Sequence, residues 1–186
     1  MDAIELLLKR VSVPRLQEPA PSPEQLDLML RAALRSPDHG QIKPWRFLTI
    51  AGDDRKQLGE LFVQGLLSTM PDADNELIEK TRVMPLRAPL LLVVIASITE
   101  HAKVPAHEQL LAAGCAAHGI LLAAHAQGVG AVWRTGAVAE MPVVNTGLGL
   151  QANEQIVAYM YLGTPINSLR NPPTVDPAPF VQIWPA

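Results

Sequence analysis

Cysteine, aromatic residues and net charge are all scarce in this chain. Cys115 is the single cysteine among 186 residues, so no disulfide forms within the chain, as expected in a reducing compartment. The net charge is only −3, which gives no long-range attraction to nucleic acid or to an anionic membrane. The longest apolar stretches, 88–98 and 110–126, are too short or too interrupted to predict a membrane span. These absences favour a cytoplasmic protein that binds neither nucleic acid nor membrane.

The usual nucleotide loops and metal-ligand patterns are missing as well. "GVGAVWRTG" leaves a helix and enters a strand, whereas a dinucleotide fingerprint runs from strand to helix, so Gly128 is interpreted as a helix cap. Cys115, His118 and His125 share one predicted helix, but no second cluster of ligands completes a tetrahedral site, and no metal is expected. Cys115 stands among alanines in mid-helix and is interpreted as a buried, inert thiol.

Helical and strand patterns alternate along what is expected to be a single domain, residues 1–186. Ser22 and Gln25 form a predicted capping box, with Pro23 at the first position of the helix. Apolar spacing predicts helices over 2–10, 22–36, 53–69, 108–127 and, briefly, 141–150. Branched and alternating runs predict strands over 45–51, 88–97, 130–136 and 155–165. The order of elements predicts an α+β or three-layer α/β plan.

Two segments are unusual for a monomer. The helix over 108–127 is apolar nearly all round, which places it at the centre of a fold or in a subunit interface. Residues 165–186 hold six of the seventeen prolines, so this tail is expected to be extended and to need a surface to lie on. Together they predict a homodimer.

Arginine and serine carry the remaining functional signal. "KRVSVPR" places Ser12 between Arg10 and Arg15 where a helix gives way to a loop, and two guanidinium groups with a hydroxyl can hold a phosphate monoester. "RSPDHGQIKPWRF", residues 35–47, is a polar and proline-rigid loop that could approach the same ligand. Trp45 and Trp133 each stand beside a basic residue at a loop-to-strand junction.

These motifs together resemble the nitroreductase family of flavoproteins, most closely its small YdjA-type members. "KRVSVPR" resembles the family's Arg-Arg-Ser-x-x-Arg motif, and the loop "RSPDHGQIKPWRF" resembles Pro-Ser-x-x-Asn-x-Gln-Pro-Trp. "AAHAQGVGAVWRTG" resembles its alanine-rich helix followed by Gly-x-Gly-x-x-Trp, and "HAKVP…EQLLAAGCAA" resembles a stretch of the YdjA type. The likeness runs collinearly over nearly the whole chain. It departs at Val11, Gln41 and Lys43, where the family commonly has Arg, Asn and Gln.

The resemblance implies a three-layer α/β/α fold with a mixed, mainly antiparallel sheet, in an intertwined homodimer whose C-terminal tail is extended. It implies FMN as cofactor, NADH or NADPH as electron donor, and a nitroaromatic, quinone or similar acceptor reduced by ping-pong hydride transfer. The flavin N5 would carry the chemistry, so no catalytic side chain is expected. The implied flavin contacts are Arg10, Val11, Ser12, Trp133, Arg134 and Thr135, with Arg35, His39 and Gln41 of the loop, Arg35 and His39 reaching across the dimer.

A second implied segment and two other functions stay open at this point. Residues 122–127, which are Leu122, Ala123, Ala124, His125, Ala126 and Gln127, match a stretch assigned to the nicotinamide nucleotide in the YdjA type. One alternative function is a non-catalytic module that binds FMN or another phosphorylated ligand. The other is a flavin-fragmenting or dehalogenating relative on the same fold.

Overall fold

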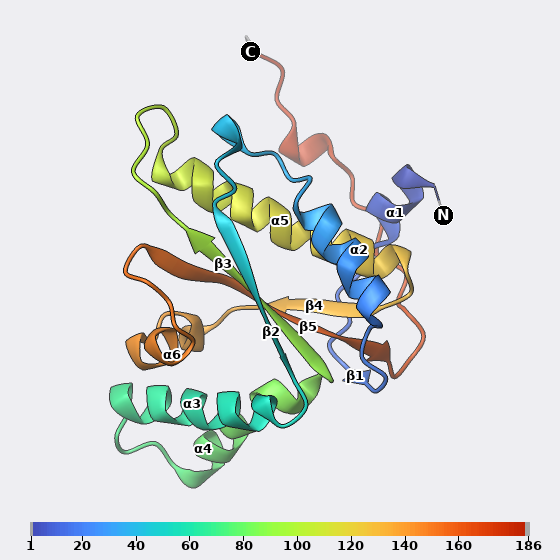
Figure 1. Ribbon diagram of the computed structural model, residues 1–186. Helices are drawn as coiled ribbons and strands as arrows, with labels where there is room; N and C mark the ends of the chain where they lie inside the picture. Colours follow the sequence, from blue (N-terminus) through green and yellow to red (C-terminus); the bar gives the residue numbers. More distant parts are fainter. Residues whose placement is uncertain (1, 185–186) are drawn as a thin grey trace.

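A five-stranded sheet lies between two layers of helices in the computed structural model, which describes residues 2–184 (Figure 1). The strands are β1 (Leu16–Gln17), β2 (Trp45–Ala51), β3 (Leu90–Ser97), β4 (Gly130–Arg134) and β5 (Glu154–Pro165). The helices are α1 (Ala3–Lys9), α2 (Pro23–Ala33), α3 (Asp54–Thr69), α4 (Asn75–Arg82), α5 (Ala106–Ala126) and α6 (Pro142–Gly147). Short 3-10 turns cover His39–Gln41, Met84–Arg87, Ala137–Ala139 and Ala178–Phe180.

Strand β5 organises the sheet, because it pairs with β3, β4 and β1. The order along the main path is β1-β5-β3-β2, and β4 pairs with β5 through Gly130↔Gly163 to Arg134↔Tyr159. All four pairings are antiparallel, where a mixed, mainly antiparallel sheet was expected. Strand β3 is buried from Leu90 to Ala96, as its unbroken apolar run predicts for a strand covered on both faces.

Helices α2 and α5 cover one face of the sheet (Figure 1). The predicted capping box starts α2, since Gln25 N donates to Ser22 Oγ and Ser22 N donates to Gln25 Oε1. The buried face of α5 is made largely of alanines, which let it lie close to the sheet and to α2. Gly119 marks the closest approach, because a Cβ there would lie 3.2 Å from the carbonyl oxygen of Ala32 in α2.

Helices α3, α4 and α6 form the second layer on the opposite face of the sheet (Figure 1). Phe62 of α3 is buried and packs edge-on against Tyr159 of β5, with ring centroids 5.3 Å apart. Gly65 lets α3 meet α6, because a Cβ at this position would lie 2.8 Å from Met141 Sδ and from Val144 Cγ2. The core therefore has two halves, one on each side of β3 and β5.

The sequence-based expectation of a buried Cys115 thiol is wrong, because this residue is exposed. It belongs to the outward face of α5, where Leu111 and His118 are also exposed, Leu111 to 65%. The same helix is long and apolar enough to span a membrane by length and composition alone, but its inner face is packed in the core. The apolar composition of α5 thus has two causes, a face in the core and a face that this single chain leaves open.

The C-terminal tail is the other open element. Beyond β5 the chain runs past α1 and away from the body (Figure 1). Its large apolar side chains are among the most exposed of the molecule, with Phe180 at 79% and Trp184 at 91%. Helix α1 likewise leaves Ile4, Leu7 and Leu8 exposed.

Candidate functional site

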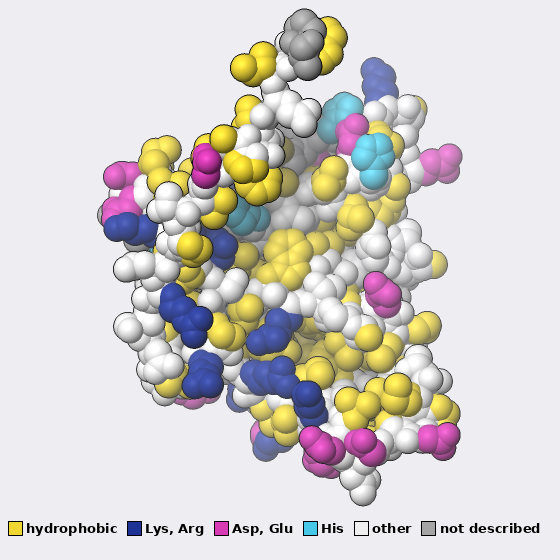
Figure 2. All heavy atoms as spheres, turned by 180° about the vertical axis from the view of Figure 1, so that it is seen from behind, with side chains coloured by type: hydrophobic (Ala, Val, Ile, Leu, Met, Phe, Trp, Pro, Cys, Tyr) yellow, Lys and Arg dark blue, Asp and Glu magenta, His cyan; other side chains and the backbone are white. Residues whose placement is uncertain are grey.

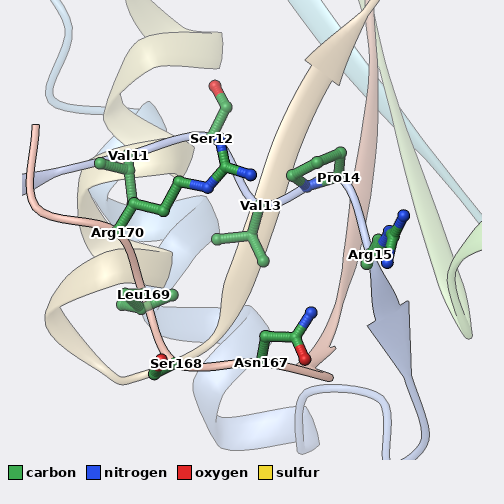
Figure 3. Close-up of a pocket in the computed structure, with 9 residues that line it drawn as sticks. All are labelled: Val11, Ser12, Val13, Pro14, Arg15, Asn167, Ser168, Leu169 and Arg170. Carbon is green, nitrogen blue, oxygen red and sulfur yellow. The ribbon is translucent and has the colours of Figure 1, made fainter.

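The segment after α1 forms one wall of a cavity. Val13 N donates to Ala131 O of β4 at 2.8 Å, and Ile166 N donates to Arg15 O at 3.2 Å, so the segment is held between β4 and the start of the tail. The cavity measures about 460 Å³ and is lined by Val11, Ser12, Val13, Pro14, Arg15, Asn167, Ser168, Leu169 and Arg170. The two lining segments face one another, and the Arg170 side chain extends toward the N-terminal one (Figure 3).

Arg10 stands at the entrance to this segment with an unused hydrogen-bond donor. Its Nη1 atom is buried and has no partner among the described residues. Burial, and after it the positive charge of Arg10, lowers the pKa of His125 at the end of α5. Arg10, His125 and the cavity residues are called the N-terminal cluster below. Basic side chains gather near exposed apolar ones on the face seen in Figure 2.

Strand β4 sends its last side chains to opposite sides of the sheet, as strand alternation requires. Trp133 lies against the middle of α5, with its Cη2 3.9 Å from where a Cβ on Gly114 would be, and its Nε1 donates to Thr135 Oγ1 at 3.1 Å. Arg134 points the other way, with its Cζ 5.8 Å from the centroid of the Tyr161 ring. The Nε of Arg134, like Nη1 of Arg10, is buried and has no hydrogen-bond partner within residues 2–184.

The loop over residues 35–44, called the His39 loop below, has a strained backbone. Gly40, Gln41 and Lys43 have φ values of +73°, +54° and +53°, in the left-handed region that side chains other than glycine and asparagine disfavour. Asp38 holds this shape, since its carboxylate accepts from Lys43 N at 2.7 Å and its carbonyl accepts from Gln41 N at 3.1 Å. Strain of this kind is found where a loop must present its side chains in one fixed way.

The His39 loop touches α5 at the end opposite to His125. His39 Nδ1 lies 2.6 Å from Glu108 Oε2, in the first turn of α5. A helix rises 1.5 Å per residue, so Glu108 and His125 are about 25 Å apart along the axis. Within one chain, His39 and His125 are therefore too far apart to contact the same ligand of cofactor size directly.

The chain matches the family model described as "Nitroreductase family" over residues 7–164. It is 44% identical over 185 residues to the Escherichia coli (strain K12) protein named "Putative NAD(P)H nitroreductase YdjA", covering 99% of this chain and 100% of that protein. The chain belongs to the nitroreductase family.

Solved structures agree with this assignment at the level of the fold. A nitroreductase-like protein from Bacillus cereus superposes with a TM-score of 0.85 at 19% identity, over 100% of this chain and 97% of that one. A Desulfovibrio desulfuricans structure described as a nitroreductase in complex with FMN gives 0.76 at 23% identity, over 98% and 96% of the two chains. At these identities the likeness concerns the fold, so the site must be argued from this chain's own residues.

In one chain, the flavin contacts implied by the sequence lie in three places. Arg10, Val11 and Ser12 lie at the N-terminal cluster, and Trp133 lies against the middle of α5. Arg35, His39 and Gln41 belong to the exposed His39 loop, and no described side chain gives Arg35 a hydrogen bond or ion pair. Arg46, at the exit of that loop, forms an ion pair with Glu154, so its charge is already compensated.

The segment implied for the nicotinamide nucleotide does not form one continuous surface. Ala124 is fully buried in the core, and Gln127 Nε2 donates to the carbonyls of Gln25 and Ala123, which ties α5 to α2. Ala126 is exposed, Leu122, Ala123, His125 and Gln127 are half-buried, and among them His125 is the member close enough to Arg10 to sense its charge. This assignment stays a prediction.

Arg170, Ser168 and Glu108 are site residues that sequence reasoning missed. Arg170 and Arg134 are the only basic residues among positions 109–186, and that isolation was a usable signal for Arg170. Glu108 gave no such signal, because its partner His39 is 69 residues away along the chain.

Proposed function

We propose that this nitroreductase-family chain is an FMN-dependent oxidoreductase that takes electrons from NADH or NADPH and reduces a nitroaromatic, quinone or similar acceptor, as a homodimer. The family assignment supports the reaction class, and the relatives' names include NAD(P)H. The observation that carries the proposal is the unpartnered, buried Nη1 of Arg10 beside the cavity formed by residues 11–15 and 167–170.

The N-terminal cluster fits the phosphate of FMN. A buried guanidinium donor without a partner is costly, and an anionic oxygen is the acceptor that compensates it best. Ser12 and Arg170 line the cavity of about 460 Å³ and supply donors of the right kind, and Arg10 directly precedes the lining segment in the chain. Arg15 lines the same cavity, which makes it the first replacement if Arg10 proves not to hold the phosphate.

The remaining site residues would bind and orient the ring system. Trp133 would supply a flat apolar surface, whereas the Arg134 side chain points to the opposite side of the sheet, so its positive charge does not lie on the same side as Trp133. FMN, when bound, supplies the redox chemistry by accepting hydride from the nicotinamide and then reducing the acceptor. Hydride transfer moves no proton through the protein, and the protons that a reduced nitro or quinone acceptor takes up can come from water. His39 is therefore assigned to cofactor contact, and no general acid is required.

Two observations on the single chain support the homodimer. His39 contacts the start of α5 and His125 stands about 25 Å away along the helix axis, so one flavin could contact both His39 and the N-terminal cluster only if they come from different chains. The apolar side chains left open on α5, α1 and the tail, among them Leu111, Leu8 and Trp184, provide the surface that an obligate interface needs. Light scattering that shows a stable monomer would contradict this.

Binding of FMN to Arg10→Ala tests the phosphate site. The purified protein should carry non-covalent FMN, and Arg10→Ala should weaken FMN binding about ten- to a hundredfold through loss of a charge-assisted hydrogen bond, roughly 1.5–3 kcal/mol. Arg31→Ala is the matched control, since Arg31 is exposed and pairs only with Asp27 on the same helix. Unchanged FMN affinity in Arg10→Ala would indicate that Arg10 does not bind the phosphate, and Arg15 would become the first candidate. A colourless protein that does not bind added FMN would refute the proposed function.

A mixed dimer of Arg10→Ala and His39→Ala chains tests whether one site is shared between subunits. If it is, one of the two sites has both substitutions and the other has neither, so the mixed dimer regains one wild-type site. If each site lies within one chain, every site has one defect and no wild-type affinity returns. Oxidation of NADPH with a quinone then separates the enzyme from a non-catalytic FMN-binding module.

A further inference from the structure

The first turn of α5 is the platform on which the His39 loop rests. Gln109 is 1% exposed, and its amide is fully used, since Oε1 accepts from Thr99 N and Nε2 donates to Thr99 O and Val104 O. Val104 is 2% exposed and meets Gly40 of the loop, where a Cβ would lie 3.2 Å from Val104 Cγ2. Gln109 thus fixes the segment that supports the loop from below.

Among residues 2–184, the hydrogen bond of Glu108, the neighbour of Gln109, is the only one from this platform to a side chain of the loop. The Oε2 atom of Glu108 lies 2.6 Å from His39 Nδ1. An ionised carboxylate can only accept a hydrogen bond, so Nδ1 of His39 carries the hydrogen. Nε2 is then the ring nitrogen that remains available for a ligand. Within residues 2–184, no group forms a hydrogen bond with Nε2.

We propose that Glu108 is a positioning residue of the cofactor site: it sets the tautomer and ring orientation of His39, so that Nε2 is the atom presented to FMN. This inference rests on the proposed function, because it takes FMN as the ligand of His39. Stability does not account for the contact, since the two side chains are 55% and 39% exposed and exposed ion pairs contribute little. The contact instead removes the rotational freedom of a side chain on a loop that is already fixed by Asp38 and Val104.

The test measures FMN binding to flavin-free protein by the quenching of FMN fluorescence. Glu108→Ala should weaken binding roughly three- to tenfold, the order expected for one net hydrogen bond. Glu108→Gln should stay within about twofold of wild type, because its amide oxygen accepts the same N–H. In a His39→Ala background, Glu108→Ala should have no further effect, since the residue through which it acts is gone. Asp27→Ala, which breaks an exposed ion pair on α2, is the matched control.

Two results would overturn the inference. One is equal FMN affinity in wild type and Glu108→Ala, and the other is a loss of affinity that persists undiminished in the His39→Ala background. Glu108→Leu repeats the comparison if thermal unfolding shows that Glu108→Ala is not folded. Failure of the wild-type protein to bind FMN would instead refute the proposed function, so the two failures are distinguishable.

Discussion

Among the carboxyl groups of this structure, Glu154 has the most strongly shifted pKa, and its partners are known. Replacing Glu154 should therefore cause a pH-dependent loss of stability. Its carboxylate accepts from Arg46 Nε and Nη2, both at 2.7 Å, from Ser97 Oγ at 2.8 Å and from Gln151 N at 3.0 Å. Its side chain is 6% exposed. These bonds, the one to Arg46 first, lower the pKa of Glu154 from 4.5 to about 2. The network joins β2, β3 and β5 just after the exit of the His39 loop.

The magnitude follows from that difference in pKa. At about 1.36 kcal/mol for each pH unit, a fall from 4.5 to about 2 makes the ionised carboxylate worth roughly 3 kcal/mol of folding free energy. The folded pKa is the lower one, so this stability is fully present above pH 4.5 and is lost as the pH falls toward 2. Glu154→Gln keeps the shape but leaves Arg46 without its counter-charge, so it should cost about 2–4 kcal/mol at pH 7.

The assay is urea unfolding of flavin-free wild type and Glu154→Gln at one protein concentration, from pH 7 down to pH 3. The difference between their free energies of unfolding should narrow below pH 4.5, because wild type loses the stabilisation by the ionised Glu154 carboxylate, which the variant lacks at every pH. Glu79→Gln is the control, since Glu79 pairs with Arg82 at an exposed site and should change stability by less than about 1 kcal/mol. A gap that stays constant from pH 7 to pH 3 would refute the reasoning.

Two further substitutions test strain and burial. Gln41→Asn should raise the free energy of unfolding by roughly 0.5 kcal/mol, because asparagine tolerates the left-handed conformation at φ +54° better than glutamine does; a urea midpoint below wild type would show that the Gln41 side chain has a role of its own. Tyr159→Phe should stabilise the protein by about 1 kcal/mol, because the Tyr159 hydroxyl is buried without a partner among the described residues. If calorimetry instead shows a lower Tm for Tyr159→Phe, the hydroxyl has a hydrogen-bond partner in solution, such as a buried water.

The elements that were predicted from the sequence are those whose type can be recognised from a pattern of neighbouring residues. Strand β3 is one unbroken apolar run, and the start of α2 is marked by the capping residues Ser22 and Gln25 and by Pro23. Strand β1 was not predicted, because its two residues are extended only by pairing with Pro165 and Thr164, far along the chain. Helix α4 was also missed: it buries only Thr81, so apolar spacing gave no signal, although Asp74 caps it by accepting from Leu77 N.

The candidate site was predictable in its residue types and not in its connections. Motif matching named Arg10, Ser12 and His39, but it could not show that Arg46 is neutralised by Glu154. The left-handed residues Gln41 and Lys43 are two of the three positions where the chain departs from the family's motifs. Both departures thus stand where the backbone of this chain has a positive φ.

The exposed face of α5 connects the fold to the proposed shared site. Glu108 and His125 stand near the two ends of the helix. The point midway between them lies at Ala116 and Ala117, flanked on the outer face by exposed Cys115 and His118. In the proposed homodimer, a two-fold axis crossing α5 near that midpoint would set the two helices antiparallel. The His39 loop of one copy would then lie beside the N-terminal cluster of the other. One symmetry operation would thus cover the apolar outer face and close the 25 Å separation, which is the geometry that the mixed dimer of Arg10→Ala and His39→Ala chains examines.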